Sequence, residues 1–240
     1  MRISVLTLFP EMFPAALGAS IIGLAQQRGL VRFQLVNIRD FARDKHQVTD
    51  DAPYGGGPGM IMKPEPICRA VRSLAGHGAR PLAILLSPRG ARYDQAMARE
   101  LSREGDIALI CGHYKGVDER VRAVVDREIS IGDFVLSGGE PAALAVVDSI
   151  VRLLPGAISD PESADRDSFE SGLLDHPHYT RPEEFEGMRV PEILRSGNHA
   201  AIARWRRRQS LLITMRRRPD LMEKAGLSGA DLDLLDADGE

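Results

Sequence analysis

Residues 3–37 have the sequence ISVLTLFPEMFPAALGASIIGLAQQRGLVRFQLVN. Its apolar spacing predicts a strand over Ile3–Phe9, a helix over Met12–Arg28 and a second strand over Val31–Asn37. The same alternation continues along the chain, with further strands expected over Ala83–Ser87, Ile107–Cys111 and Glu128–Ile131, and further helices over Pro66–Ala75, Asp94–Ser102 and Glu140–Leu153. Several strands are apolar throughout, as expected when helices cover both faces of a sheet. The sequence therefore predicts an α/β domain with a mostly parallel sheet over residues 1–158.

The sequence changes character after Pro155-Gly156. Residues 159–166 are polar, acidic and without periodicity, and we expect residues 159–174 to form a flexible linker. A long helical pattern then opens at Asn198, a good N-cap residue, and ends before Pro219. We therefore expect residues 175–240 to form a small all-α domain.

The composition is typical of a folded protein in a reducing compartment. Hydrophobic residues are 43% and charged residues 27% of the chain, which is ordinary for a protein with a core. Cys68 and Cys111 lie far apart and have no zinc-ligand spacing, so we expect free thiols. The apolar N-terminus is too short for a signal peptide, and no stretch approaches the ~20 apolar residues of a membrane span. We expect a cytoplasmic protein with no membrane partner.

Three glycine-bearing loops each follow a predicted strand: Leu86–Gly90, Cys111–Gly116 and Ile131–Glu140. In open α/β sheets, ligands bind beyond the carboxyl ends of the strands, so the three loops together predict one shared pocket. Backbone groups there can bind the edge of an adenine while aliphatic side chains cover its faces. Taken singly, each loop is more typical of a tight turn. The glycine-rich segment Tyr54–Met60 is as typical of a surface loop as of a ligand site.

Two charged segments carry further candidates. The acidic linker offers a general base, and spacing does not choose among Asp160, Glu162, Asp165, Asp167 and Glu170. The predicted C-terminal helix holds seven arginines and no acid over residues 204–218, which favours polyanion binding over a merely solvated face. The histidines show no metal-ligand spacing, so we expect no metal site.

These features together resemble the bacterial tRNA (guanine-N1)-methyltransferases, a family of the knotted SPOUT methyltransferase class. The resemblance covers nearly the whole chain, and its motifs follow the family's order. They are Leu8–Phe13, Pro53–Met60, Ile131–Glu140, Asp167–Phe169, Gly172–Asp175, His178–Pro182, Ser196–His199 and Trp205-Arg206. Lys115 departs from the pattern, because a glutamate often stands at this position, and we assign its side chain no role.

The resemblance implies a homodimer whose N-terminal domain contains a deep trefoil knot, where general topology rules predict an unknotted sheet. It also implies that the three loops form the knot and hold S-adenosylmethionine in a bent shape. The cofactor-binding positions carried over from the family are Leu86, Ser87, Pro88, Gly112, Tyr114, Ile131, Gly132, Asp133, Phe134, Val135, Leu136, Gly138 and Gly139.

The reaction implied by the family is methylation of N1 of the guanosine at tRNA position 37, immediately 3′ of the anticodon. The resemblance selects Asp167 as the base that removes the N1 proton, and it assigns Arg152 to stabilise negative charge on the guanine oxygen. The linker is expected to become ordered when tRNA lies across the dimer, so that Asp167 of one subunit reaches the cofactor of the other. A dependence on magnesium is also implied, although the sequence shows no ligand cluster for it.

Three other functions stay open on the sequence. Another kind of knotted RNA methyltransferase, acting on ribosomal RNA or on ribose, would share the first domain but not the C-terminal one. A nucleotide-binding RNA chaperone without chemistry would have no need of Asp167 and Arg152. A dehydrogenase would need the dinucleotide glycine fingerprint and its downstream acid, which the chain lacks.

Overall fold

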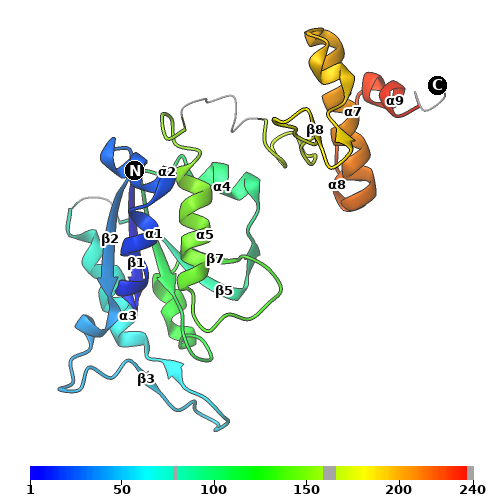
Figure 1. Ribbon diagram of the computed structural model, residues 1–240. Helices are drawn as coiled ribbons and strands as arrows, with labels where there is room; N and C mark the ends of the chain where they lie inside the picture. The colour runs from blue at the N-terminus through cyan, green and yellow to red at the C-terminus, as the bar shows by residue number, and fades with distance from the viewer. Residues whose placement is uncertain (78–79, 159–165, 237–240) are drawn as a thin grey trace. The chain divides into compact units, whose positions relative to one another are not determined.

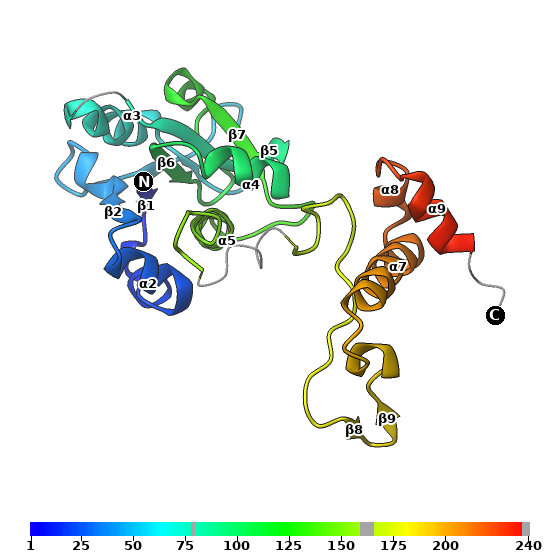
Figure 2. The same ribbon diagram turned by 90° about the horizontal axis from the view of Figure 1, so that it is seen from above.

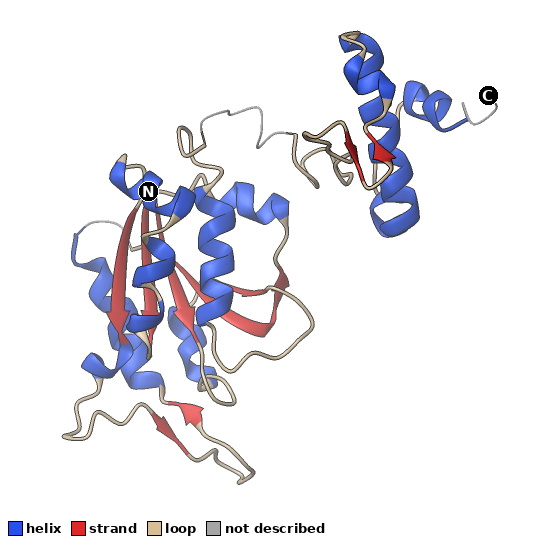
Figure 3. Ribbon diagram, viewed as in Figure 1, coloured by secondary structure: helices blue, strands red, loops and turns tan. Residues whose placement is uncertain are grey.

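The computed structural model describes residues 1–77, 80–158 and 166–236. The chain divides into two compact units, Met1–Pro161 and Glu162–Glu240, and each is described by itself. Figure 1 follows the chain from its N-terminus, and Figure 3 separates helices from strands. Across the described residues, no helix is long and apolar enough to cross a lipid bilayer.

The first unit is built on a sheet of five strands in the order β2-β1-β6-β5-β7. The strands are β1 (Arg2–Thr7), β2 (Arg32–Asn37), β5 (Leu82–Arg92), β6 (Asp106–Cys111) and β7 (Arg127–Ser130). Every neighbouring pair in this sheet is parallel. The mostly parallel sheet predicted from the sequence is therefore confirmed, and each expected strand is present with its ends shifted by a few residues.

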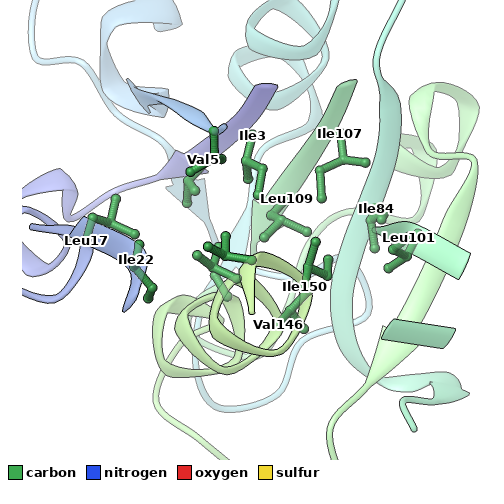
Figure 4. Close-up of a cluster of buried hydrophobic side chains, with 14 of the residues drawn as sticks. Ile3, Val5, Leu17, Ile22, Ile84, Leu101, Ile107, Leu109, Val146 and Ile150 are labelled. Atoms are coloured by element: carbon green, nitrogen blue, oxygen red, sulfur yellow. The ribbon is translucent and has the colours of Figure 1, made fainter. Parts of the chain in front are cut away.

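Both faces of the central part of the sheet are buried, because alternate side chains of β1, β5 and β6 enter two different cores. On β1, Ile3 and Val5 belong to one hydrophobic cluster and Leu6 to the other. The first cluster, drawn in Figure 4, also takes side chains from α5 (Glu140–Val151), including Val146 and Ile150. The second cluster lies under α3 (Pro64–Ser73), which covers the opposite face of the sheet from α2 (Ser20–Gln27) and α5 (Figure 2). This two-sided burial explains the uninterrupted apolar runs of the strands.

The helices of the first unit begin and end close to their predicted positions, with one exception. They are α1 (Pro14–Leu17), α2 (Ser20–Gln27), α3 (Pro64–Ser73), α4 (Gln95–Leu101) and α5 (Glu140–Val151), with 3-10 turns η1 (Pro10–Met12), η2 (Ile38–Phe41), η3 (Leu74–His77) and η4 (Glu119–Val124). The single helix predicted over Met12–Arg28 is wrong. It is divided because Ala19 has extended backbone (φ −103°, ψ 159°), so α2 starts afresh after it.

The glycine-rich segment Tyr54–Met60 lies between the strands of a short antiparallel hairpin that the sequence did not predict. Its strands are β3 (Asp50–Asp51) and β4 (Ile61–Met62). Four glycines of the segment have positive φ, among them Gly57 at 112°. A hairpin this short gives the segment little regular structure, and the conformational freedom of glycine is what allows the chain to turn there.

The second unit is mainly helical. Its elements are β8 (Glu184–Phe185), β9 (Met188–Arg189), η5 (Glu192–Arg195), α7 (His199–Arg217), α8 (Pro219–Met222) and α9 (Gly229–Asp236). The predicted N-cap is confirmed, because the Asn198 side chain accepts a hydrogen bond from Ala201 N at 3.1 Å. The β8–β9 hairpin was not predicted. The flexible linker stays a prediction: residues 159–165 lie outside the described residues, and residues 166–174 form turns ahead of α7.

Candidate functional site

The three sequence segments expected to share a pocket leave neighbouring strands at the same edge of the sheet. Leu86 of β5 pairs with Cys111, the last residue of β6, and also with Ile129 near the end of β7. Because the three strands are parallel, their carboxyl ends meet at this edge. The three segments therefore begin side by side, and their forming one pocket stays a prediction.

The second and third loops are in direct backbone contact. Gly139 N donates to Gly112 O at 2.8 Å, and His113 forms an isolated antiparallel bridge with Gly138. A Cβ added to Gly139 would lie 2.8 Å from Cys111 Cα, so only glycine fits where the chain passes. The second and third loops therefore pass each other in direct backbone contact, a contact called the crossing below.

The first segment is not a free loop. Residues 86–90 belong to β5, whose pairing with β7 shifts register between Leu86 and Ala91, as in a β-bulge. Gly90 allows that bulge to press against β7, since a Cβ there would lie 2.3 Å from Ile129 N. Ser87 is half-buried and Pro88 is exposed. The bulge therefore presents both residues at the edge where the other two loops begin.

Exposed apolar side chains gather on the second and third loops. Tyr114 is 43% exposed, Phe134 54%, Val135 89% and Leu136 38%. Ile131 and Gly132 are half-buried and Asp133 is exposed. Apolar surface of this kind suits the flat face of a base. A cavity lined by Leu82 and Asp106 opens instead at the amino ends of β5 and β6, and it has none of these features.

Glu140, the first residue of α5, is a buried carboxylate to which the sequence analysis assigned no role. It is 1% exposed, and Thr7 Oγ1 donates to its Oε1 at 2.7 Å. Its Oε2 lies 3.9 Å from Nδ1 of His113. Burial, with a contribution from Glu140, raises the pKa of the Cys111 thiol well above its usual value, so that thiol is no nucleophile. The sequence held one signal for Glu140, because it is an acid at the predicted start of a helix, where the helix dipole favours a carboxylate.

Arg152 lies at the opposite end of α5 from these loops, and Asp167 belongs to the second unit. Arg152 caps the C-terminal end of α5, whose other end follows the third loop. Because α5 has 12 residues, its ends lie about 18 Å apart. Asp167 is half-buried in the second unit, in a turn ahead of α7.

The arginines of α7 and its C-cap fall into two groups. Arg207 donates two hydrogen bonds to Asp231, at 2.6 and 3.0 Å, and Arg218 pairs with Asp220 at 2.7 Å. Arg208 Nε donates to the backbone oxygen of Leu234 at 3.0 Å. The other four are exposed, and within the described part of the chain no acid pairs with them: Arg204, Arg206, Arg216 and Arg217. These four make the basic surface of the helix.

Three side chains that the sequence did not suggest as ligands lie close together in the second unit. Candidate ligand atoms of Asp175, His176 and His178 are all within 4.8 Å of one another. His178 Nε2 hydrogen-bonds to Asp175 Oδ2 at 2.8 Å. Burial alone would raise the pKa of Asp175, but hydrogen bonds from His178 and from the His176 backbone outweigh it and lower that pKa. One carboxylate and two imidazoles do not suit magnesium, which prefers oxygen ligands.

A parallel sheet whose glycine-bearing segments cross at its carboxyl edge, joined to an arginine-rich helical unit, defines a SPOUT-type α/β protein. The family model described as tRNA (Guanine-1)-methyltransferase TrmD matches residues 1–224. The chain belongs to this family. Both the family and the fold class predicted from the sequence are thereby confirmed.

Individual relatives are similar in sequence to this chain over nearly their full length. A tRNA (guanine-N(1)-)-methyltransferase of Moorella thermoacetica is 56% identical over 234 residues, covering 96% of this chain and 94% of that protein. One of Dictyoglomus turgidum is 53% identical over 236 residues, covering 98% and 96%. The solved structure of the tRNA (m1G37) methyltransferase from Aquifex aeolicus has a TM-score of 0.76 and 41% identity, over 93% of this chain and 95% of that one.

Proposed function

We propose that this chain transfers a methyl group from S-adenosylmethionine to N1 of the guanosine at position 37 of tRNA. The observation that carries the proposal is the crossing of Gly138-Gly139 against Cys111-Gly112, which joins two of the three predicted cofactor segments at one edge of the sheet. Membership of the tRNA (Guanine-1)-methyltransferase family supplies the substrate class.

The methyl donor would be held by the segments that meet at this edge. The backbone around Gly112 and Gly132 would bind the adenine edge, and the apolar side chains of Phe134, Val135 and Leu136 would cover its faces. The remaining proposed contacts come from Leu86, Ser87, Pro88, Tyr114, Ile131, Asp133, Gly138 and Gly139. When bound, the positively charged sulfonium supplies the methyl group.

The protein's chemical task is to make guanine N1 nucleophilic. N1 carries a proton, and its lone pair becomes available for attack only when that proton leaves. Asp167 would accept the proton, and the Arg152 guanidinium would stabilise the negative charge that develops on the guanine oxygen. Both residues therefore need to approach the bound cofactor.

A homodimer would meet that requirement. The length of α5, about 18 Å, separates Arg152 from the cofactor segments of its own chain, so the cofactor of a second copy is a natural partner. Met12 and Leu24 add exposed apolar surface to the first unit, each being 46% exposed. We propose that Asp167 of one subunit likewise acts at the cofactor of the other.

The basic surface of α7 would bind the phosphates of the tRNA, with base identity determined at an unstacked loop nucleotide. The cytoplasm, where tRNA is modified, is the expected compartment. We derive no step through magnesium, because within the described residues the one three-residue cluster of candidate ligands does not suit it.

The test is transfer of labelled methyl groups to two tRNA transcripts that differ only in having guanosine or adenosine at position 37. Label is expected on the guanosine transcript alone. An Asp167→Asn enzyme should be slower by about two to four orders of magnitude, while the neighbouring Glu170→Gln should keep most of its rate. No transfer to either transcript, from folded protein that binds the donor, would contradict the proposal and favour a ribosomal RNA substrate or a chaperone role.

A further inference from the structure

The proposed base lies at the start of a compact turn. Phe169 N donates to Leu173 O at 2.7 Å, Gly172 N to Phe169 O at 3.1 Å, and Glu170 N to Asp167 O at 3.3 Å. Phe169 and Gly172 both have φ of 77°, a value that few residues other than glycine adopt. A backbone held in this conformation needs support from its surroundings.

That support comes from two hydroxyl groups one turn apart on α7. Leu174 N donates to Thr214 Oγ1 at 2.9 Å, and Ser210 Oγ donates to Leu174 O. The same Thr214 hydroxyl donates to Ser210 O at 2.7 Å, so it is both donor and acceptor. Thr214 is fully buried, and Ser210 is 9% exposed. The backbone N–H and C=O of Leu174 are therefore both bonded to side chains of the helix.

Two further contacts hold the turn against the same unit. Leu173, beside the bonded residue, is 1% exposed. At the C-terminal end of α7, the Arg218 guanidinium lies 6.0 Å from the ring centroid of Phe169, within the range of a cation–π contact. These contacts therefore attach the turn to the rest of the second unit at Phe169 and at Leu173-Leu174.

Serine and threonine are poor choices for a helix interior, because their hydroxyls compete for backbone hydrogen bonds. A threonine can satisfy itself by bonding back to the carbonyl four residues earlier, as Thr214 does. After that bond, the Thr214 oxygen can still accept a hydrogen bond from another segment, and the Ser210 hydroxyl is fully available to one. Both are directed to Leu174, which indicates that they serve to fix the turn.

We propose that Ser210 and Thr214 are positioning residues that hold the Asp167 turn on the arginine-bearing helix. The inference rests on the proposed function, in which Asp167 is the base. A base fixed in this way moves together with the surface that binds tRNA, so that docking of the RNA and delivery of the carboxylate are one event. Both hydroxyls are buried against the turn, so their role is to position it and not to contact substrate.

The experiment uses the full-length protein with Ser210→Ala, Thr214→Val and the two combined. We expect the single-turnover rate at saturating donor and tRNA to fall about 10- to 100-fold in the double variant, because misplacement by about 1 Å costs that much. The dissociation constant for S-adenosylmethionine should not change, and that for tRNA should change less than threefold. Thr214→Ser, which keeps the hydroxyl, should restore the rate.

Two variants control for a general loss of folding. Ser228→Ala removes a hydroxyl from the same unit, where it bonds to Asp231 and not to the turn, and should leave the rate unchanged. Gly172→Ala strains only the turn, because its φ is positive while a Cβ there meets nothing within 4 Å. It should slow the reaction even though the packing of α7 is untouched.

The outcomes separate the two proposals. Full rate in the double hydroxyl variant and in Gly172→Ala, together with a slow Asp167→Asn enzyme, would overturn the positioning role alone. Full rate in Asp167→Asn itself would overturn the proposed function. A slow double variant whose tRNA affinity falls as much as its rate would show that the hydroxyls support RNA binding and not the base, and would also overturn the inference.

Discussion

Replacing Gly139 by alanine tests how closely the second and third loops pass each other at the carboxyl edge of the sheet. Gly139 has an ordinary backbone conformation (φ −78°, ψ −7°), so alanine introduces no backbone strain there. The added Cβ would instead lie 2.8 Å from Cys111 Cα and 3.2 Å from Gly112 N. Both neighbours are backbone atoms of the crossing, and neither can swing aside as a flexible side chain would.

The expected cost follows from that overlap. Non-bonded carbon atoms prefer a separation of about 3.5–4.0 Å, so the methyl group must push the crossing open by about 0.7 Å or more. Overpacking of this kind costs about 1–3 kcal/mol. For a domain of about 150 residues, each kcal/mol lowers Tm by about 2–4 °C, so we expect a loss of roughly 2–12 °C. The same displacement should weaken S-adenosylmethionine binding at least about tenfold, because it moves the proposed binding groups.

The assay pairs thermal unfolding with calorimetric titration of S-adenosylmethionine. The matched control is Gly105→Ala, where a Cβ meets nothing within 4 Å. Alanine there should be neutral, or stabilising by up to about 1 kcal/mol, because it restricts the unfolded chain. If Gly139→Ala keeps the Tm and the affinity of the unaltered protein, the crossing is looser than the distances indicate, and the steric argument is refuted.

Three further perturbations test other parts of the molecule. Replacing Arg216 and Arg217 by glutamine should reduce the slope of log affinity for tRNA against log salt by about 1–2, measured by filter binding. The Arg207 hydrogen bonds hold the pKa of Asp231 well below its ordinary value. The stabilisation that the ionised Asp231 gives the folded state is therefore complete above about pH 5 and is lost progressively at lower pH, so Asp231→Asn should flatten the fall of Tm between pH 5 and 3. Thr7→Val removes the donor to a buried carboxylate oxygen and should cost about 1–3 kcal/mol in urea unfolding.

The strands of the first unit could be predicted because their burial depends on local sequence. Ile107–Cys111 is apolar at every position, and the structure buries all five side chains by dividing them between two cores. The N-cap of α7 could be predicted for a similar reason, since the Asn198 side chain bonds to a residue only three positions away. Local sequence was therefore enough to predict an element wherever its side chains need only burial or a hydrogen-bond partner a few residues away.

The crossing of the second and third loops at the carboxyl edge of the sheet could not be predicted from the residues themselves. Gly138 and Gly139 look like an ordinary turn before a helix, and their partners at Gly112 and His113 lie more than twenty residues earlier. General rules of chain topology argue against a knot, and only the family resemblance supplied it. The division of the predicted helix at Ala19 was not predicted for a different reason. The apolar spacing continues across Ala19, and spacing alone does not show where the backbone changes direction.

The arginines of α7 show why a charge pattern in the sequence overstates a binding surface. All seven look equivalent in the sequence, yet Arg207 is held by Asp231 at a separation of 24 residues, and Arg208 by the backbone of α9 at 26. These two fasten α9 to α7 and are committed to the fold. Arg218 pairs with Asp220 and lies over Phe169, so it belongs to the support of the proposed base. The salt dependence of tRNA binding by this helix should therefore reflect the four exposed arginines and not seven.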